Sequence, residues 1–70
     1  MTSHKRTFAY KANWYGEIIS GYTKSDSAYA AERNSILQIA RKVGRTAYAV
    51  REYILDKKHD RFEIKEVIEK

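Results

Sequence analysis

Apolar and polar positions alternate in the N-terminal part of the chain, and a period of two is typical of a half-buried strand. Residues 7–12 (TFAYKA) place three apolar side chains on one side of the chain, Phe8, Tyr10 and Ala12. Residues 17–22 (EIISGY) predict a second strand, and residues 13–16 between them include Asn and Gly, which favour a turn. The two strands predict a β-hairpin, in which Gly21 indicates a bulge or the end of the second strand.

The pattern then changes to helical spacing. A helix that begins near Ala28 has three suitable N-caps before it, Ser25, Asp26 and Ser27. Asn34 and Ser35 interrupt the segment, because both side chains compete for backbone hydrogen bonds. We therefore predict two helices, over 27–33 and 36–43, with one continuous helix as the alternative.

The C-terminal part of the chain predicts a further helix and a closing strand. Residues 47–56 carry apolar side chains at helical spacing, Val50, Tyr53 and Ile54. Residues 56–60 (DKKHD) predict a polar loop, and residues 61–68 (RFEIKEVI) predict a strand, although a short helix also suits the end of the chain. This order of elements predicts an α+β fold, either winged-helix-like or a small β-sheet packed on helices.

Length and composition limit the possibilities further. We expect a flexible basic tail over residues 1–6 and a single domain over 7–70. The 70 residues include no cysteine and two isolated histidines, His4 and His59, so we expect no disulfide, metal or other cofactor. No apolar run is long enough to span a membrane, and we expect a cytoplasmic protein.

The positive charge is concentrated in one part of the chain. The net charge is +5, which favours an anionic partner such as nucleic acid. Residues 41–58 contain six basic residues against two acidic ones, a local charge of +4. Nearly all of the excess therefore lies around the last two predicted helices.

The same region meets the spatial demands of two helices joined by a tight turn. Such a turn needs a small side chain where the helices cross, a residue that tolerates positive φ, and apolar residues directed into a shared core. Residues 36–55 (ILQIARKVGRTAYAVREYIL) supply these in order. Ala40 is the small residue, Gly44 the turn, and the core positions are Ile39, Val43, Val50 and Tyr53.

Quoted whole, this segment resembles the helix-turn-helix of prokaryotic repressors and recombinases, in which an Ala, a Gly and a Val or Ile recur at these spacings. Arg45 departs from the pattern, because an apolar residue usually follows the glycine there. The order of hairpin, helices and closing strand is also similar to that of small phage or mobile-element proteins. The resemblance implies a DNA-binding transcription regulator.

In that arrangement the helix after Gly44 enters the major groove of double-stranded DNA. The expected base contacts are Thr46, Ala47, Tyr48 and Arg51, and the fork of Arg51 suits the two acceptors of a guanine edge. The expected contacts to the DNA backbone are Gln38, Arg41, Lys42, Arg45, Lys57 and Lys58. A domain of this size usually needs a homodimer or an extra arm for useful affinity.

Other functions remain as alternatives to sequence-specific DNA binding. An enzyme is not expected, because no serine or acidic residue has the neighbours that nucleophilic or acid–base catalysis needs. A phage-type inhibitor or adaptor would bind an acidic protein partner through the basic and aromatic face. A non-specific binder of RNA or single strands would use the hairpin, stacking bases on Phe8, Tyr10, Trp14 and Tyr15 beside Lys5, Arg6 and Lys11.

Overall fold

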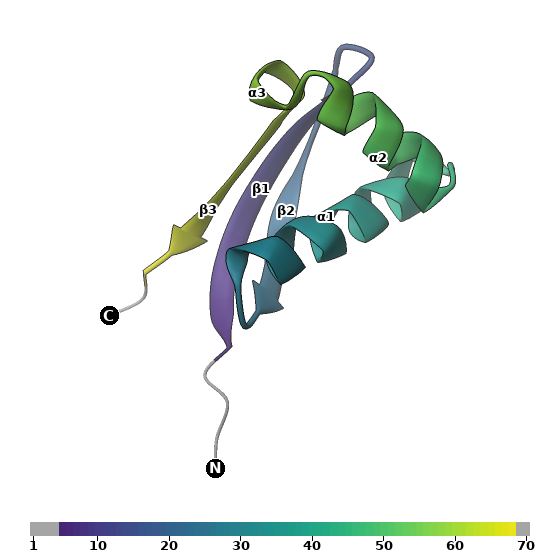
Figure 1. Cartoon of the computed structure of the whole chain (residues 1–70). Coiled ribbons are helices and arrows are strands. Elements are labelled where there is room, and N and C mark those ends of the chain that lie inside the picture. The colour runs from purple at the N-terminus through teal and green to yellow at the C-terminus, as the bar shows by residue number, and fades with distance from the viewer. Residues whose placement is uncertain (1–4, 69–70) are drawn as a thin grey trace.

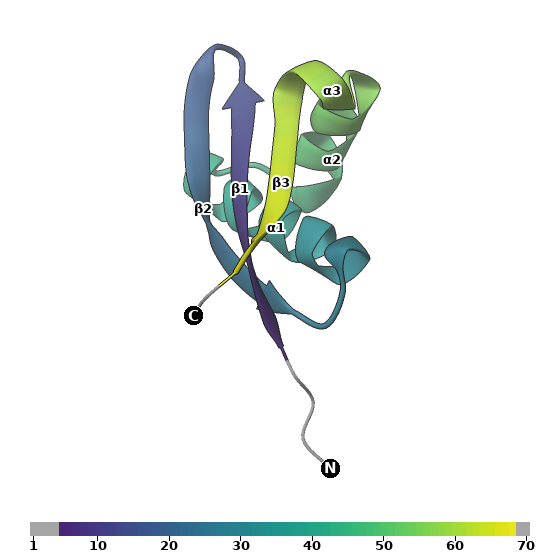
Figure 2. The same ribbon diagram turned by 90° about the vertical axis from the view of Figure 1, so that its left-hand side faces the viewer.

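Three strands and three helices make up residues 5–68, the part of the chain that the computed structural model describes. The elements are β1 (Arg6–Trp14), β2 (Glu17–Ser25), α1 (Ala28–Val43), α2 (Ala47–Asp56), α3 (Lys58–Arg61) and β3 (Phe62–Val67). The strands form one antiparallel sheet in the order β2-β1-β3. Both long helices lie on the same face of this sheet, and the other face is open (Figures 1 and 2). The predicted α+β fold is confirmed.

The hairpin turns over two residues, Tyr15 and Gly16, both with positive φ (51° and 92°). Positive φ at both positions matches the right-handed twist of the flanking strands. The amide of Gly16 donates to Oδ1 of Asn13 at 2.7 Å, which satisfies the Asn side chain within the turn. Because the turn is this tight, β1 continues past the predicted residue 12 to Trp14. At the end away from the turn, β2 continues past the predicted residue 22 to Ser25, which pairs with Arg6.

The alternation of β1 divides the sheet into a covered and an open face. Phe8, Tyr10 and Ala12 are buried under the helices, as the sequence pattern predicts. The strand register continues without interruption past Gly21, so the expected bulge or strand end is wrong. Gly21 lies opposite Tyr10, and a Cβ at this position would stand 2.6 Å from the Tyr10 hydroxyl oxygen. The missing side chain makes room for the Tyr10 ring.

α1 is a single helix of 16 residues, so the predicted division into 27–33 and 36–43 is wrong. Ser35 lies fully buried in it, and its hydroxyl donates to the carbonyl oxygen of Ala31 at 2.7 Å. Asn34 donates to the hydroxyl oxygen of Ser25 at 2.8 Å. Both side chains therefore find partners compatible with a helix, Ser35 at the carbonyl four residues before it and Asn34 at a side chain of β2. The helix begins at the expected cap, because Ser27 accepts a hydrogen bond from the amide of Ala30.

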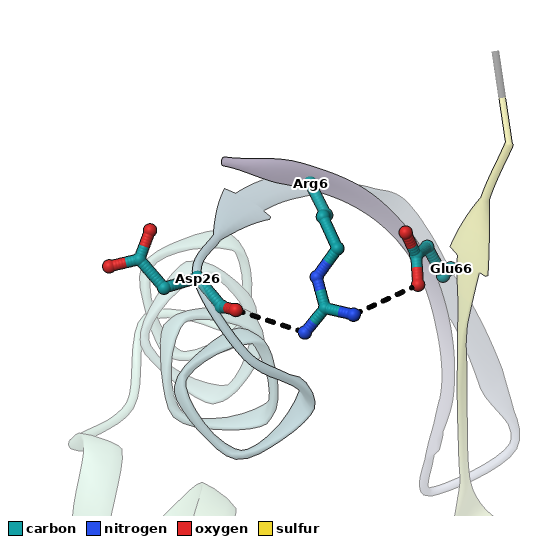
Figure 3. Close-up of polar contacts among 3 residues, drawn as sticks. All are labelled: Arg6, Asp26 and Glu66. Atoms are coloured by element: carbon teal, nitrogen blue, oxygen red, sulfur yellow. Dashed lines mark hydrogen bonds and ion pairs between the residues drawn. The ribbon is translucent and has the colours of Figure 1, made fainter. Parts of the chain in front are cut away.

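The C-terminal segment forms a strand that pairs with β1. The predicted polar loop over 56–60 instead contains the single turn of α3, and the chain then enters β3, the expected strand. At the far end of this strand, the Arg6 guanidinium donates to Glu66 at 3.3 Å and to the backbone carbonyl oxygen of Asp26 at 2.9 Å (Figure 3). Arg6 thus joins β1, β3 and the connection between β2 and α1. Of the expected basic tail over 1–6, residues 1–4 lie outside the described residues, and Arg6 begins β1.

Replacing Gly21 tests whether the Tyr10 ring packs directly against the backbone of β2. Gly21→Ala is expected to lower the free energy of unfolding by about 1–3 kcal/mol, because the added methyl group displaces the buried Tyr10 ring. The loss should shrink in a Tyr10→Phe background, since the nearest atom is then absent. Urea denaturation measures both effects, with the exposed neighbour Ser20→Ala as control. An unchanged midpoint for Gly21→Ala would contradict this packing.

Candidate nucleic-acid interface

A three-residue turn joins α1 to α2, as the sequence predicts. Gly44 adopts the left-handed conformation with φ 71°, and its amide donates to the carbonyl oxygen of Ala40. The amide of Arg45 donates to the same carbonyl at 3.0 Å. Thr46 then caps α2, because its hydroxyl oxygen accepts a hydrogen bond from the amide of Ala49 at 3.1 Å. Three amides at the turn, those of Gly44, Arg45 and Ala49, therefore have local partners.

The core beneath the turn holds α2 against α1 and the sheet. Ala40 is buried where the helices cross, and Val50 and Ile54 are completely buried on the inner side of α2. Val43 is half-buried and packs on the same core. Arg45, which departs from the helix-turn-helix pattern, is exposed, and its neighbours rather than Arg45 itself form the core. Of the positions expected to be internal, Ile39 and Val50 are completely buried, and Val43 and Tyr53 are half-buried and pack against the core.

The far end of α2 is fixed by aromatic side chains. The Tyr53 ring stacks on Tyr15 of the hairpin turn with centroids 4.2 Å apart, and Trp14 meets it edge-on at 5.0 Å. The Arg61 guanidinium lies 3.8 Å from the centroid of the Tyr53 ring and donates to the Tyr53 carbonyl oxygen. α2 is therefore held at both ends, which fixes the direction of its exposed face.

The expected base contacts lie together on that exposed face. Tyr48 is 70% exposed, Arg51 and Thr46 are also exposed, and Ala47 is half-buried. Three of these four residues line a groove of about 530 Å³ between α1 and α2, which we call the α1–α2 groove. The residues of α2 that line it are Ala47, Tyr48, Arg51 and Leu55.

The expected backbone contacts divide into two groups. Arg41, Arg45 and Lys57 are exposed, and within residues 5–68 none of them forms an ion pair or a side-chain hydrogen bond. The other three have partners within the chain. Gln38 accepts a hydrogen bond from the Tyr10 hydroxyl at 2.7 Å, Lys42 donates to the Ser20 carbonyl oxygen, and Lys58 pairs with Glu32 at 2.9 Å.

Sequence reasoning missed the contribution of α1 to the groove. From α1, the groove is lined by Tyr29, Glu32, Arg33, Ile36 and Leu37. Tyr29, Arg33 and Leu37 follow one another at intervals of four, which is the spacing of one helix face. This stripe becomes visible only when 28–43 is treated as one helix, so the predicted break at Asn34 and Ser35 concealed it.

The aromatic surface expected on the hairpin does not form. Phe8 and Tyr10 are buried under the helices, and only Tyr15 of the four expected aromatic residues is exposed. A different set of side chains occupies the open face of the sheet, where the strand register places the exposed residues Lys11, Tyr22, Lys24 and Lys65. Phe8 and Tyr10 are therefore not accessible for base stacking, whereas Tyr15 is exposed and Trp14 is half-buried.

Among the described residues, no helix is both long enough and apolar enough to cross a membrane. Comparison with protein-family models, with curated proteins and with solved structures gave no match to this chain. The assignment of a function therefore depends on the exposed chemistry of α1, α2 and the turn between them.

The left-handed turn can be tested by substitution at Gly44. Gly44→Ala is expected to lower the free energy of unfolding by about 1–2 kcal/mol, because φ 71° is strained for a residue with a Cβ. No atom lies within 4 Å of that Cβ, so crowding adds nothing. Gly44→Asn should cost less, since Asn tolerates the left-handed region. Urea denaturation of the two variants measures the difference, and equal stability of Gly44→Ala and the unmodified protein would count against the turn.

Proposed function

We propose that this protein binds double-stranded DNA with sequence preference, with α2 in the major groove. The observation that carries the proposal is the exposed face of α2, where Tyr48 and Arg51 project beside a cationic turn. The turn's Arg41 and Arg45 form no ion pair within residues 5–68. A major groove admits one α-helix, and the N-terminal residues of such a helix reach the base edges. A small DNA-binding domain of this kind fits a regulator of transcription, in keeping with the motif in residues 36–55.

Arg51 is the principal candidate for reading a base. Its guanidinium is exposed and, within residues 5–68, engaged in no ion pair, so both donors of its fork are available to a guanine edge. Thr46, Ala47 and Tyr48 lie one turn nearer the start of α2, and they are suited to a thymine methyl group or a neighbouring phosphate.

Phosphate contacts come from the residues around the turn and from α1. Arg41 and Arg45 flank Gly44, Lys57 follows α2, and Arg33 lies across the α1–α2 groove from Arg51. In this arrangement α1 crosses the DNA backbone, as the first helix of such a pair does. Four phosphate contacts give modest affinity, and two copies on adjacent half-sites would raise it.

The central prediction is that Arg51→Ala removes preference for one base position. The substitution should cost about 1–3 kcal/mol at that position, roughly 5- to 150-fold in relative affinity. The measurement is selection from a pool of duplexes with randomised centres, followed by titration of the enriched duplex at two salt concentrations. Arg45→Ala should weaken all duplexes alike and reduce the salt slope by about 0.9.

Lys65→Ala is the matched control, because it removes one positive charge from the open face of the sheet. It should leave both base preference and affinity nearly unchanged. Equal binding of duplex, single-stranded DNA and RNA, unaffected by Arg51→Ala, would refute the proposal.

A further inference from the structure

The α1–α2 groove gathers exposed apolar side chains from both helices. Eight large hydrophobic side chains are exposed in residues 5–68, and four of them line this one groove, Tyr29, Leu37, Tyr48 and Leu55. Ile36 and Ala47 form the floor between the two helices. Exposed apolar side chains that gather in one concave site mark a binding site more often than scattered ones do.

The charged side chains that border the groove and are available to a partner are positive. Glu32 is the only acidic residue in the lining, and Lys58 neutralises it at 2.9 Å. Arg33 and Arg51 are exposed, and neither forms an ion pair or side-chain hydrogen bond within residues 5–68. The groove therefore combines an apolar floor with two available guanidinium groups, and it complements a ligand that is both apolar and acidic.

Duplex DNA complements only part of this surface. Phosphates satisfy Arg33 and Arg51, but a duplex presents no apolar stripe that would cover Leu37 and Leu55. Tyr29 and Leu37 are separated by about 12 Å along α1, since a helix rises 1.5 Å per residue. This span matches an occupant helix of about two turns with apolar residues at positions i, i+3 or i+4, and i+7.

From these observations we infer that the α1–α2 groove binds an acidic amphipathic helix of a partner protein. The apolar side chains of that helix lie on Ile36, Leu37 and Leu55, and its flanking carboxylates pair with Arg33 and Arg51. Tyr48 and Arg51 also belong to the surface proposed for DNA, so the partner helix and the duplex exclude each other. Only this competition rests on the proposed function, because binding of the helix requires no DNA.

The test is selection of a displayed library of random 16-residue peptides on the full-length chain. Leu37→Glu is the decoy for counter-selection, because Leu37 is 51% exposed and a charge there stays in contact with solvent. We expect the selected peptides to share apolar residues at helical spacing with flanking Asp or Glu. A labelled peptide from the selection should bind Leu37→Glu and Arg33→Glu about ten-fold or more weakly than the unmodified protein.

Ile18→Glu is the matched control, because Ile18 is 58% exposed and lies on the open face of the sheet. It should change the affinity less than two-fold, and circular dichroism checks that each variant is folded. Selected peptides without acidic residues, no enrichment, or equal binding by Leu37→Glu and Ile18→Glu would overturn the inference. A dimer in sedimentation that Leu37→Glu dissociates would overturn it as well, by making a second copy the occupant.

Competition separates this inference from the proposed function. Unlabelled peptide should release bound duplex from the protein. If a peptide binds through Leu37 while the duplex stays bound, the groove is still a binding site for the partner helix. Only the claim that the helix and the duplex exclude each other would then be overturned. Failure of every duplex to bind would overturn the proposed function and leave the peptide measurement intact.

Discussion

The left-handed backbone at Gly44 is the constraint on which the exposed surface of this protein depends. It ends α1, turns two amides toward the Ala40 carbonyl and sends the chain back along α1 as α2. Without that reversal, Tyr48 and Arg51 would lie far from Tyr29 and Arg33, and no groove would exist between the helices. The direction of α2 then depends on a second attachment, the stack of Tyr53 on Tyr15 in the hairpin turn. A helix fixed at both ends loses little backbone entropy when a ligand binds to it.

The two faces of the molecule differ in chemistry. The helical face combines apolar side chains with arginines, whereas the open face of the sheet carries lysines around Tyr22. Arginine supplies planar, directional donors for base edges and carboxylates, while lysine acts as a hydrated point charge. Selective recognition is therefore expected on the helical face. The lysines of the sheet add positive charge without directional donors.

Local sequence signals predict much of this fold. The alternation of Phe8, Tyr10 and Ala12, the turn at Gly16 and the spacing of Ala40, Gly44 and Val50 each reflect a requirement of the local backbone, and each prediction is confirmed. The hairpin and β3 are likewise predicted from short-range patterns in the sequence.

The features that sequence reasoning missed depend on tertiary partners. Asn34 stays in a helix because Ser25 is within reach from β2, and Gly21 matters because the Tyr10 ring crosses it. Neither partner is evident from spacing along the chain. The part of the groove contributed by α1 was missed for the same reason, since its stripe requires an unbroken helix. The exposed residues of α2 were identified in advance, whereas the partners of Gln38 and Lys58 emerged only from the fold.

If the helical face, held by the turn at Gly44, is the surface that meets a ligand, its amides should respond to the enriched duplex. Amide chemical-shift mapping by NMR during a titration with that duplex measures this response. We expect the largest changes at Arg41, Arg45 and residues 46–52, with little change at Lys11, Tyr22 and Lys65. Changes concentrated on the open sheet face, with α2 unaffected, would contradict this expectation.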